Sequence, residues 1–149
     1  MKRSTLLSCI VFLSVLGLAD AWYLADTALT GGSLACSMEG LSGCNAVAKS
    51  AYSHLFGVPL GVYGLAFYGV FLIAALFAMR RVSQGMDRML MLLGIVGLLA
   101  SVAFVYVQLA LIKAVCIYCL GSAGISVLLA GAAFLVVRSA RAEVSLAGS

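Results

Sequence analysis

The chain has 149 residues, of which 64% are hydrophobic and only 9% are charged, and its formal net charge is +4. Soluble domains usually carry charge on about a quarter of their residues, so this chain has too few charges to cover a water-exposed surface. The composition excludes an ordinary soluble domain and predicts one membrane domain over residues 1–149.

Four stretches are apolar and long enough to cross a bilayer, which takes about 20 residues. The first contains Asp20 as its one charged residue, and the other three contain no Lys, Arg, Asp or Glu. We therefore expect an all-α, integral membrane four-helix bundle. The predicted spans are residues 6–24, 58–79, 89–111 and 116–137.

The first span has an alternative interpretation as a cleaved secretory signal. Basic residues precede an apolar run, and Ala19 and Ala21 form a small-x-small pattern like that of a cleavage site. Apolar and aromatic residues continue beyond this point, which favours the interfacial end of a retained helix.

The basic residues predict how the bundle is oriented. Seven of them fall at the predicted helix ends on one side and two on the other, and short loops rich in Lys and Arg stay in the cytoplasm. Both termini should therefore be cytoplasmic, and we expect a multi-pass membrane protein; the resemblance described below implies that the membrane is the bacterial inner (plasma) membrane. The positive charge reflects topology, so we expect no nucleic-acid partner. The seven are Lys2, Arg3, Arg80, Arg81, Arg88, Arg138 and Arg141, and the two are Lys49 and Lys113.

The connections between the spans are unequal in length. Residues 25–54 form the one large external loop, between the first and second helices, and the loop is rich in Gly and Ser. The second connection, residues 80–88, should be a short cytoplasmic turn, and the third is only a few residues around Lys113. No thioredoxin domain is fused within this sequence.

Four of the five cysteines should gather at the external face. Cys36 and Cys44 lie in the large loop, and Cys116 and Cys119 form a Cys-x-x-Cys pair where the fourth helix begins. A thiolate at a helix N-terminus is stabilised by unpaired amides and the helix dipole, which lowers its pKa and suits it to redox exchange. Cys9 lies near the other face and should be a small packing residue.

Two other uses of these cysteines stay open. Two inert disulfides would staple the loop and the start of the helix, which is a common use of cysteines outside the cytoplasm. A membrane carrier that passes a soft metal ion between thiols is also compatible with four cysteines at one face. Because the first pair is Cys-x7-Cys and not Cys-x-x-Cys, we expect no bound structural metal.

The sequence resembles the vitamin K epoxide reductase family, in its bacterial disulfide-forming branch. The resemblance runs from about residue 17 to residue 135, and it is carried by GLADAWYLA, the loop cysteines, CNAVAKSAYSHLFGVPLGVYGLAFYG and CIYC. Bacterial DsbB-like enzymes have a similar architecture, but they carry their Cys-x-x-Cys pair early in the chain. The order of the cysteine pairs, with the Cys-x-x-Cys pair last, therefore favours the vitamin K epoxide reductase family.

The resemblance implies a route for electrons. A separate periplasmic thioredoxin-fold protein, DsbA-like, would reduce a Cys36–Cys44 disulfide. Cys44 would then attack Cys116, and Cys119 would reduce a membrane quinone, either ubiquinone or menaquinone. The output would be disulfide bond formation. An enzyme of the same family whose main product is quinol, from vitamin K, another quinone or a quinone epoxide, is the leading alternative.

Candidate quinone contacts also follow from the resemblance. Ser50 matches the family pattern six residues after Cys44, and Ser53 stands where animal members carry a quinone-contacting asparagine. Ser122, one turn below Cys119, stands beside the position of a tyrosine hydroxyl in those members. Phe56, Phe67 and Tyr68 are expected to line the quinone pocket. The roles of Asp20 and His54 stay open, and Gly57-x-x-x-Gly61 is interpreted as close helix packing.

Overall fold

The computed structural model describes residues 3–35 and 43–147, with side chains described as far as residue 140. Within these ranges, four helices are long and apolar enough to cross a membrane, which confirms the predicted all-α membrane fold. Helices suit a bilayer because each satisfies its own backbone hydrogen bonds. They are α1 (Arg3–Thr30), α3 (Leu60–Arg80), α4 (Gln84–Tyr106) with its π-helical continuation η2 (Val107–Ile112), and α5 (Ile117–Ala147).

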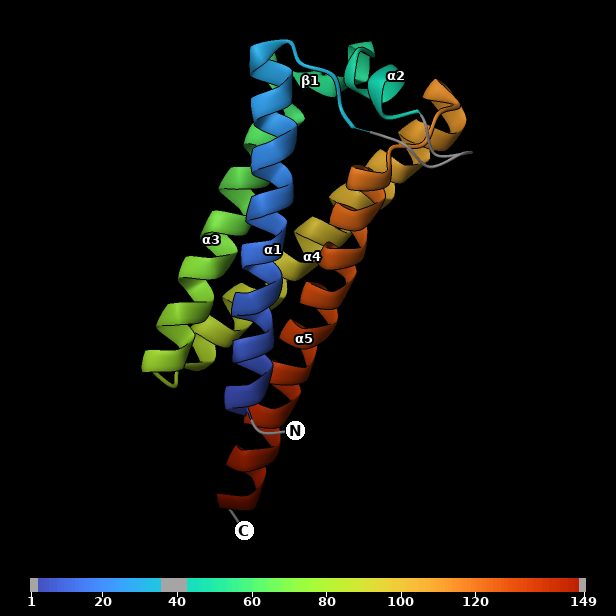
Figure 1. Cartoon of the computed structure of the whole chain (residues 1–149). Helices are drawn as coiled ribbons and strands as arrows, with labels where there is room; N and C mark the ends of the chain where they lie inside the picture. Colours follow the sequence, from blue (N-terminus) through green and yellow to red (C-terminus); the bar gives the residue numbers. More distant parts are fainter. Residues whose placement is uncertain (1–2, 36–42, 148–149) are drawn as a thin grey trace.

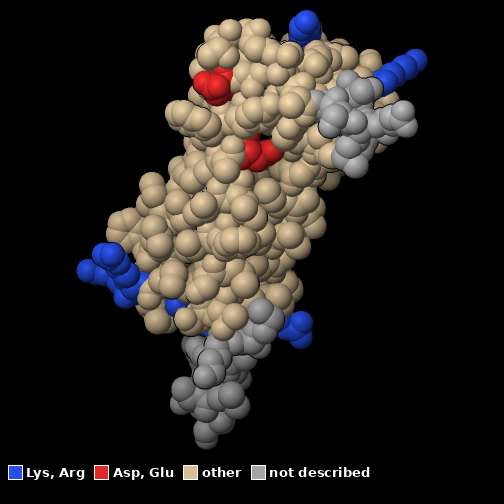
Figure 2. Space-filling view, viewed as in Figure 1, with Lys and Arg blue, Asp and Glu red and all other residues tan. Residues whose placement is uncertain are grey.

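The four long helices form an elongated bundle in which α1 packs against both α3 and α5, and α4 packs against α5 (Figure 1). The beginning of α1 and the end of α5 lie at one end of the bundle, as an even number of spans requires. Figure 2 shows Lys and Arg side chains at the two ends and a belt free of them between, as expected for a surface that faces lipid.

The core of the bundle is built from apolar and small side chains of all four helices. Tyr68 and Phe71 of α3 are its largest fully buried members. Small residues let the helices approach closely: a Cβ on Gly61 would lie 2.5 Å from the backbone nitrogen of Ala25, and one on Gly94 would lie 2.9 Å from the Cα of Ala130. The predicted packing role therefore holds for Gly61.

The connection between α3 and α4 is shorter than residues 80–88, because α3 continues to Arg80 and α4 already begins at Gln84. Asp87 is buried on α4, and its carboxylate accepts a hydrogen bond from the Arg3 guanidinium at 2.7 Å. Arg3 also donates to the carbonyl of Ala78. This ion pair neutralises Asp87, which allows a residue expected in a turn to lie inside the bundle.

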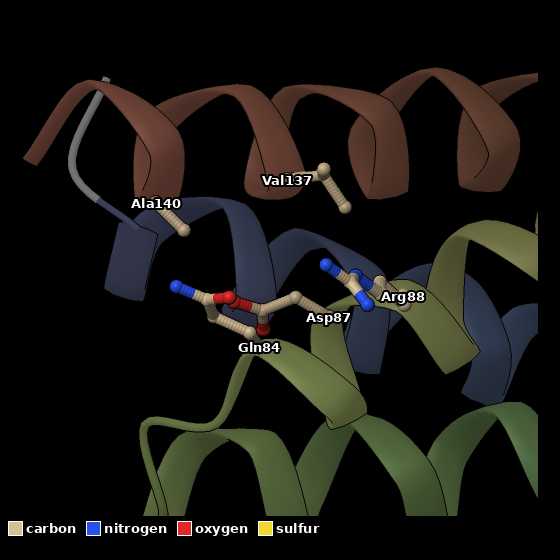
Figure 3. A pocket seen from close by; sticks show the side chains of 5 residues that line it. All are labelled: Gln84, Asp87, Arg88, Val137 and Ala140. Atoms are coloured by element: carbon tan, nitrogen blue, oxygen red, sulfur yellow. The ribbon is translucent and has the colours of Figure 1, made fainter. Parts of the chain in front are cut away.

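A cavity of about 30 Å³ lies beside Asp87. Its lining comes from α4 and α5, and Figure 3 shows these side chains gathered between the two helices. The volume suits a water molecule and is far too small for a quinone. The lining residues are Gln84, Asp87, Arg88, Val137 and Ala140.

The short elements lie at the opposite end of the bundle from the beginning of α1 (Figure 1). Two of them, β1 and β2, form an antiparallel hairpin that the all-α expectation did not include. Phe56 (φ 53°) and Gly57 (φ 80°) form its two-residue turn, and positive φ at both positions is typical of a type I′ turn. The short elements are α2 (Cys44–Ala48), the 3₁₀ turn η1 (Ala51–Ser53), β1 (His54–Leu55) and β2 (Val58–Pro59).

Two expectations about packing are corrected by these contacts. Gly57 does not mediate helix packing, since nothing lies within 4 Å of a Cβ built on it. Glycine is favoured at this position because the hairpin turn requires a positive φ. Cys9 is exposed on the surface of α1, so it does not pack inside the bundle.

Candidate active site

Cys116 and Cys119 lie where α5 begins. Cys116 directly precedes the helix, and its carbonyl accepts the backbone N–H of Leu120 at 3.0 Å. Both side chains are free thiols, and a hydrogen bond from the Cys119 thiol lowers the pKa of Cys116 to about 7. Backbone N–H groups of Cys119 and Tyr118 act in the same direction. Cys116 is therefore the residue of this pair that is poised to carry the thiolate.

The π-helical end of the preceding helix fixes the position of Cys116. Gln108 in η2 is buried, and its side-chain oxygen accepts the backbone N–H of Cys116 at 2.9 Å. Its own carbonyl accepts the N–H of Ala114, and Lys113 (φ 56°) takes a left-handed conformation that reverses the chain. Single π-helical turns of this kind frequently occur at functional sites.

Cys44 begins α2 and lies in the same small buried cluster as Cys116. Cys44 and Cys116 have exposed fractions of 0% and 1%, and Leu34 is the third buried member of the cluster. Cys44 is disulfide-bonded. Cys36 lies outside the described residues, so its predicted pairing with Cys44 stays a prediction. The structure thus brings one loop cysteine, in oxidised form, against a reduced dithiol.

The chain on both sides of residues 36–42 is held in place. On the N-terminal side, the Asn45 side chain accepts the N–H of Leu34 at 2.9 Å and donates to its carbonyl at 3.3 Å. On the C-terminal side, Gly43 packs so closely that an added Cβ would lie 2.7 Å from the backbone nitrogen of Val115. These contacts seat Cys44 beside Cys116.

Two tyrosines add a clamp on the residue before Cys36. The Tyr23 hydroxyl accepts the N–H of Ala35 at 3.2 Å, and the Tyr118 hydroxyl donates to its carbonyl at 2.9 Å. The two rings lie 5.0 Å apart between their centroids. Because Tyr23 belongs to α1 and Tyr118 to α5, the membrane helices themselves hold the loop.

A polar cluster lies one helical turn beyond Cys119. The Tyr68 hydroxyl is hydrogen-bonded to the Ser122 hydroxyl at 2.7 Å and to the Ser126 hydroxyl at 3.2 Å. Asp20 of α1 lies beside Ser122, and its Oδ2 atom is buried without a hydrogen-bond partner in the described structure. Ser122 is thus placed near the dithiol, as its candidate role requires.

The other candidate quinone contacts are not hydrogen-bonded to this cluster in the described structure. The hydroxyl of Ser50 donates to the carbonyl of Val47, and that of Ser53 donates to the carbonyl of Ser50. The Ser53 hydroxyl also lies 2.8 Å from Nδ1 of His54. Phe56 is 94% exposed at the tip of the hairpin. The structure does not bring Phe56 into a buried site with the cysteines.

Several residues that build the site were not singled out from the sequence. Gln108 offered a signal, because it is the single amide in the third apolar stretch. Asn45 and the two clamping tyrosines gave none, since their partners are backbone groups whose positions depend on the folded loop. Among the described residues, no group of three or more His, Cys, Asp or Glu side chains is arranged to hold a metal ion.

A Cys-x-x-Cys dithiol at the end of a four-helix membrane bundle, with an oxidised loop cysteine against it, defines a multi-pass membrane protein of thiol redox chemistry. A family model, the vitamin K epoxide reductase family, matches residues 8–134. The chain belongs to this family, which confirms the resemblance, and is a membrane oxidoreductase acting on thiols and quinones. No curated protein matches the chain significantly.

Proposed function

We propose that this protein, in a bacterial inner membrane, oxidises a separate DsbA-like thioredoxin-fold protein on the external side and reduces a membrane quinone. The observation that supports this most directly is the shared burial of Cys44 and Cys116 in one cluster. A disulfide-bonded Cys44 beside the free thiols of Cys116 and Cys119 corresponds to the enzyme after the helix pair has been reduced and before it has reduced quinone.

The proposed reaction balances over two exchanges. The partner's dithiol reduces the loop disulfide of Cys36 and Cys44, and the partner becomes oxidised. The Cys44 thiolate then attacks Cys116 and displaces Cys119, after which Cys36 attacks Cys44 and restores the loop disulfide. The helix dithiol finally forms its own disulfide, while two electrons and two protons convert quinone to quinol.

The direction of flow is set by redox potential. A DsbA-type disulfide is a strong oxidant, at about −120 mV, so the final acceptor must be more oxidising than that. A respiratory quinone meets this requirement and dissolves in the lipid around the bundle. The proposed external orientation of the site follows from the basic residues, which concentrate at the opposite end of the helices.

The experiment is a trapping assay with Cys119→Ala. Without Cys119 the helix disulfide cannot form, so the Cys116 thiolate should attack Cys44 in the loop disulfide, release Cys36 and leave a Cys44–Cys116 bridge. Mass spectrometry of the alkylated protein should identify this bridge. Cys9→Ala is the matched control, because Cys9 lies on the exposed surface near the other end of α1. A Cys36–Cys116 bridge in place of the expected one would reverse the order of transfer.

A second measurement tests the acceptor. Purified wild-type protein, given the reduced donor and a ubiquinone or menaquinone analogue, should form one quinol for each donor disulfide. The same assay with a quinone epoxide distinguishes the epoxide-reducing alternative. If the donor's thiols are not oxidised while quinone is present, the proposed function is wrong.

A further inference from the structure

Asp20 is an acid within a membrane helix that no described ion pair accounts for. It lies four residues before residue 24, the predicted outer end of the first span, roughly 6 Å along the axis at 1.5 Å per residue. An ionisable side chain at this depth is costly, so such residues usually serve a function.

The two other acids whose side chains are described in these helices differ from Asp20. Asp87 is paired with Arg3, and Asp26 is exposed on the surface of α1. Asp20 has a buried Oδ2 atom that finds no hydrogen-bond partner among the described residues. A carboxylate with one oxygen buried and without a hydrogen bond is best stabilised by holding a proton on that oxygen.

The surroundings of Asp20 connect it to the dithiol. It lies beside the hydroxyl of Ser122, which is one helical turn from Cys119 on α5. Ionised Asp20 would oppose formation of the Cys116 thiolate, so the two groups are electrostatically linked. On α3 the nearest titratable group in this network is Tyr68, hydrogen-bonded to Ser122.

The number of protons that the reaction consumes suggests a role for Asp20 at this position. Quinol formation needs two protons as well as two electrons. When Cys116 is a thiolate, as in about half of the molecules at pH 7 because its pKa is lowered to about 7, the dithiol brings only one proton. The second proton must then come from another group, and Asp20 is the described acid that lies beside Ser122, one turn from the dithiol.

We propose that Asp20 is the proton-transfer group of the helix dithiol, working through the Ser122 hydroxyl. In the state that precedes quinone reduction, Asp20 is protonated and Cys116 is a thiolate. As the Cys116–Cys119 disulfide forms and two electrons leave for the quinone, one proton comes from the Cys119 thiol and the other from Asp20. Asp20 then regains a proton from the external water. This inference rests on the proposed reduction of quinone.

The main experiment compares Asp20→Asn with wild type and with Asp26→Asn, an exposed acid on the same helix that serves as the matched control. Anaerobically reduced protein is mixed with a quinone analogue, and quinol formation is followed across a pH range. General acid–base groups contribute at least about 100-fold, so Asp20→Asn should slow the reaction by roughly that factor. Its rate should fall further as pH rises, because solvent protons must replace Asp20. Asp20→Glu should recover part of the rate.

A specific outcome would overturn the inference. If Asp20→Asn reduces quinone at the wild-type rate with an unchanged pH profile, Asp20 does not transfer protons. Trapping of the Cys44–Cys116 bridge in a Cys119→Ala background should be unaffected by Asp20→Asn, which separates proton transfer from general damage. Should Asp20→Asn fail to fold, Ser122→Ala removes the link to the dithiol and carries the same expectations for rate and pH profile.

An infrared measurement separates this inference from the proposed function. The difference spectrum between oxidised and dithiol-reduced protein should contain a shifted carboxyl C=O band, because Asp20 is protonated in both states while Cys116 changes from thiolate to disulfide beside it. This shifted band should be absent in Asp20→Asn and retained in Asp26→Asn. This readout needs no quinone, so it supports the inference even if another acceptor is used. Absence of the band in wild type overturns the inference, whereas failure of wild type to reduce any quinone would refute only the proposed acceptor.

Discussion

Replacing Asn45 by Ala should loosen the chain that precedes Cys36. The Asn45 side chain makes two hydrogen bonds to the backbone of Leu34, at 2.9 and 3.3 Å, and Leu34 is only 5% exposed. A hydrogen bond contributes about 0.5–1.5 kcal/mol net, and the longer of these two belongs at the low end of that range. Together they should stabilise the closed loop by about 1–2 kcal/mol, a factor of roughly 5 to 30 in its opening equilibrium.

Hydrogen exchange of the peptide that contains Leu34 measures this directly. The exchange rate should rise by that factor in Asn45→Ala, and reduction of the Cys44 disulfide by a small phosphine should accelerate in parallel. Asn45→Asp keeps the acceptor and loses the donor, so its exchange rate should lie between those of the wild type and Asn45→Ala. Ser33→Ala is the control, because Ser33 is exposed and its side chain makes no hydrogen bond within the described residues. An unchanged exchange rate in Asn45→Ala would refute this account of how the loop is held.

Two further predictions concern the cysteines. In the fully reduced protein, thiolate absorbance should appear as pH rises through about 7, because the pKa of Cys116 lies below the ordinary thiol value, and Cys116→Ser should lose this absorbance. In Cys119→Ala the midpoint of this titration should rise. An unmoved midpoint would show that the Cys119 hydrogen bond does not lower the pKa of Cys116. Gly43→Ala should slow trapping of the Cys44–Cys116 bridge, because the added Cβ would lie 2.7 Å from the backbone nitrogen of Val115, whereas Gly121→Ala, with nothing within 4 Å of an added Cβ, should leave trapping unchanged.

The membrane helices could be predicted from the sequence because hydrocarbon imposes a simple condition. Each of the last three predicted spans lacks Lys, Arg, Asp and Glu, and the bilayer excludes such side chains unless they are paired. The ends of the helices were less predictable. Asp87 looked like a residue of a turn, and it lies in α4 because Arg3, which is 84 positions away, neutralises it. A local pattern contains no information about such a partner.

The site was predictable to a similar degree. The Cys-x-x-Cys pair was expected where the fourth helix begins, and Cys116 directly precedes α5 while Cys119 lies in its first turn. What holds them could not be predicted. The bonds from Gln108 to Cys116 and from Asn45 to Leu34 cross a π-helical turn and an irregular loop, where no periodicity relates the partners. The hairpin was missed because its strands are only two residues long.

The burial of the cysteines also bears on how a water-soluble donor enters the proposed route. Thiol–disulfide exchange requires the attacking thiolate to reach a sulfur of the disulfide. Cys44 and Cys116 are shielded from water, with exposed fractions of 0% and 1%. A large donor cannot attack either of them while Asn45 and the tyrosine clamp hold the loop closed, so in the proposed route the donor must attack Cys36. Cys44 then acts as the inner cysteine, which exchanges only with the helix pair. In Cys36→Ala, Cys44 can still attack Cys116, displace Cys119 and form a Cys44–Cys116 bridge. Release of Cys44 from that cluster in Asn45→Ala should expose this bridge to the donor's two thiols, so the double variant should regain a measurable part of the donor-dependent activity that Cys36→Ala loses. Complete inactivity of the double variant, with the loop shown to open, would contradict this division of roles.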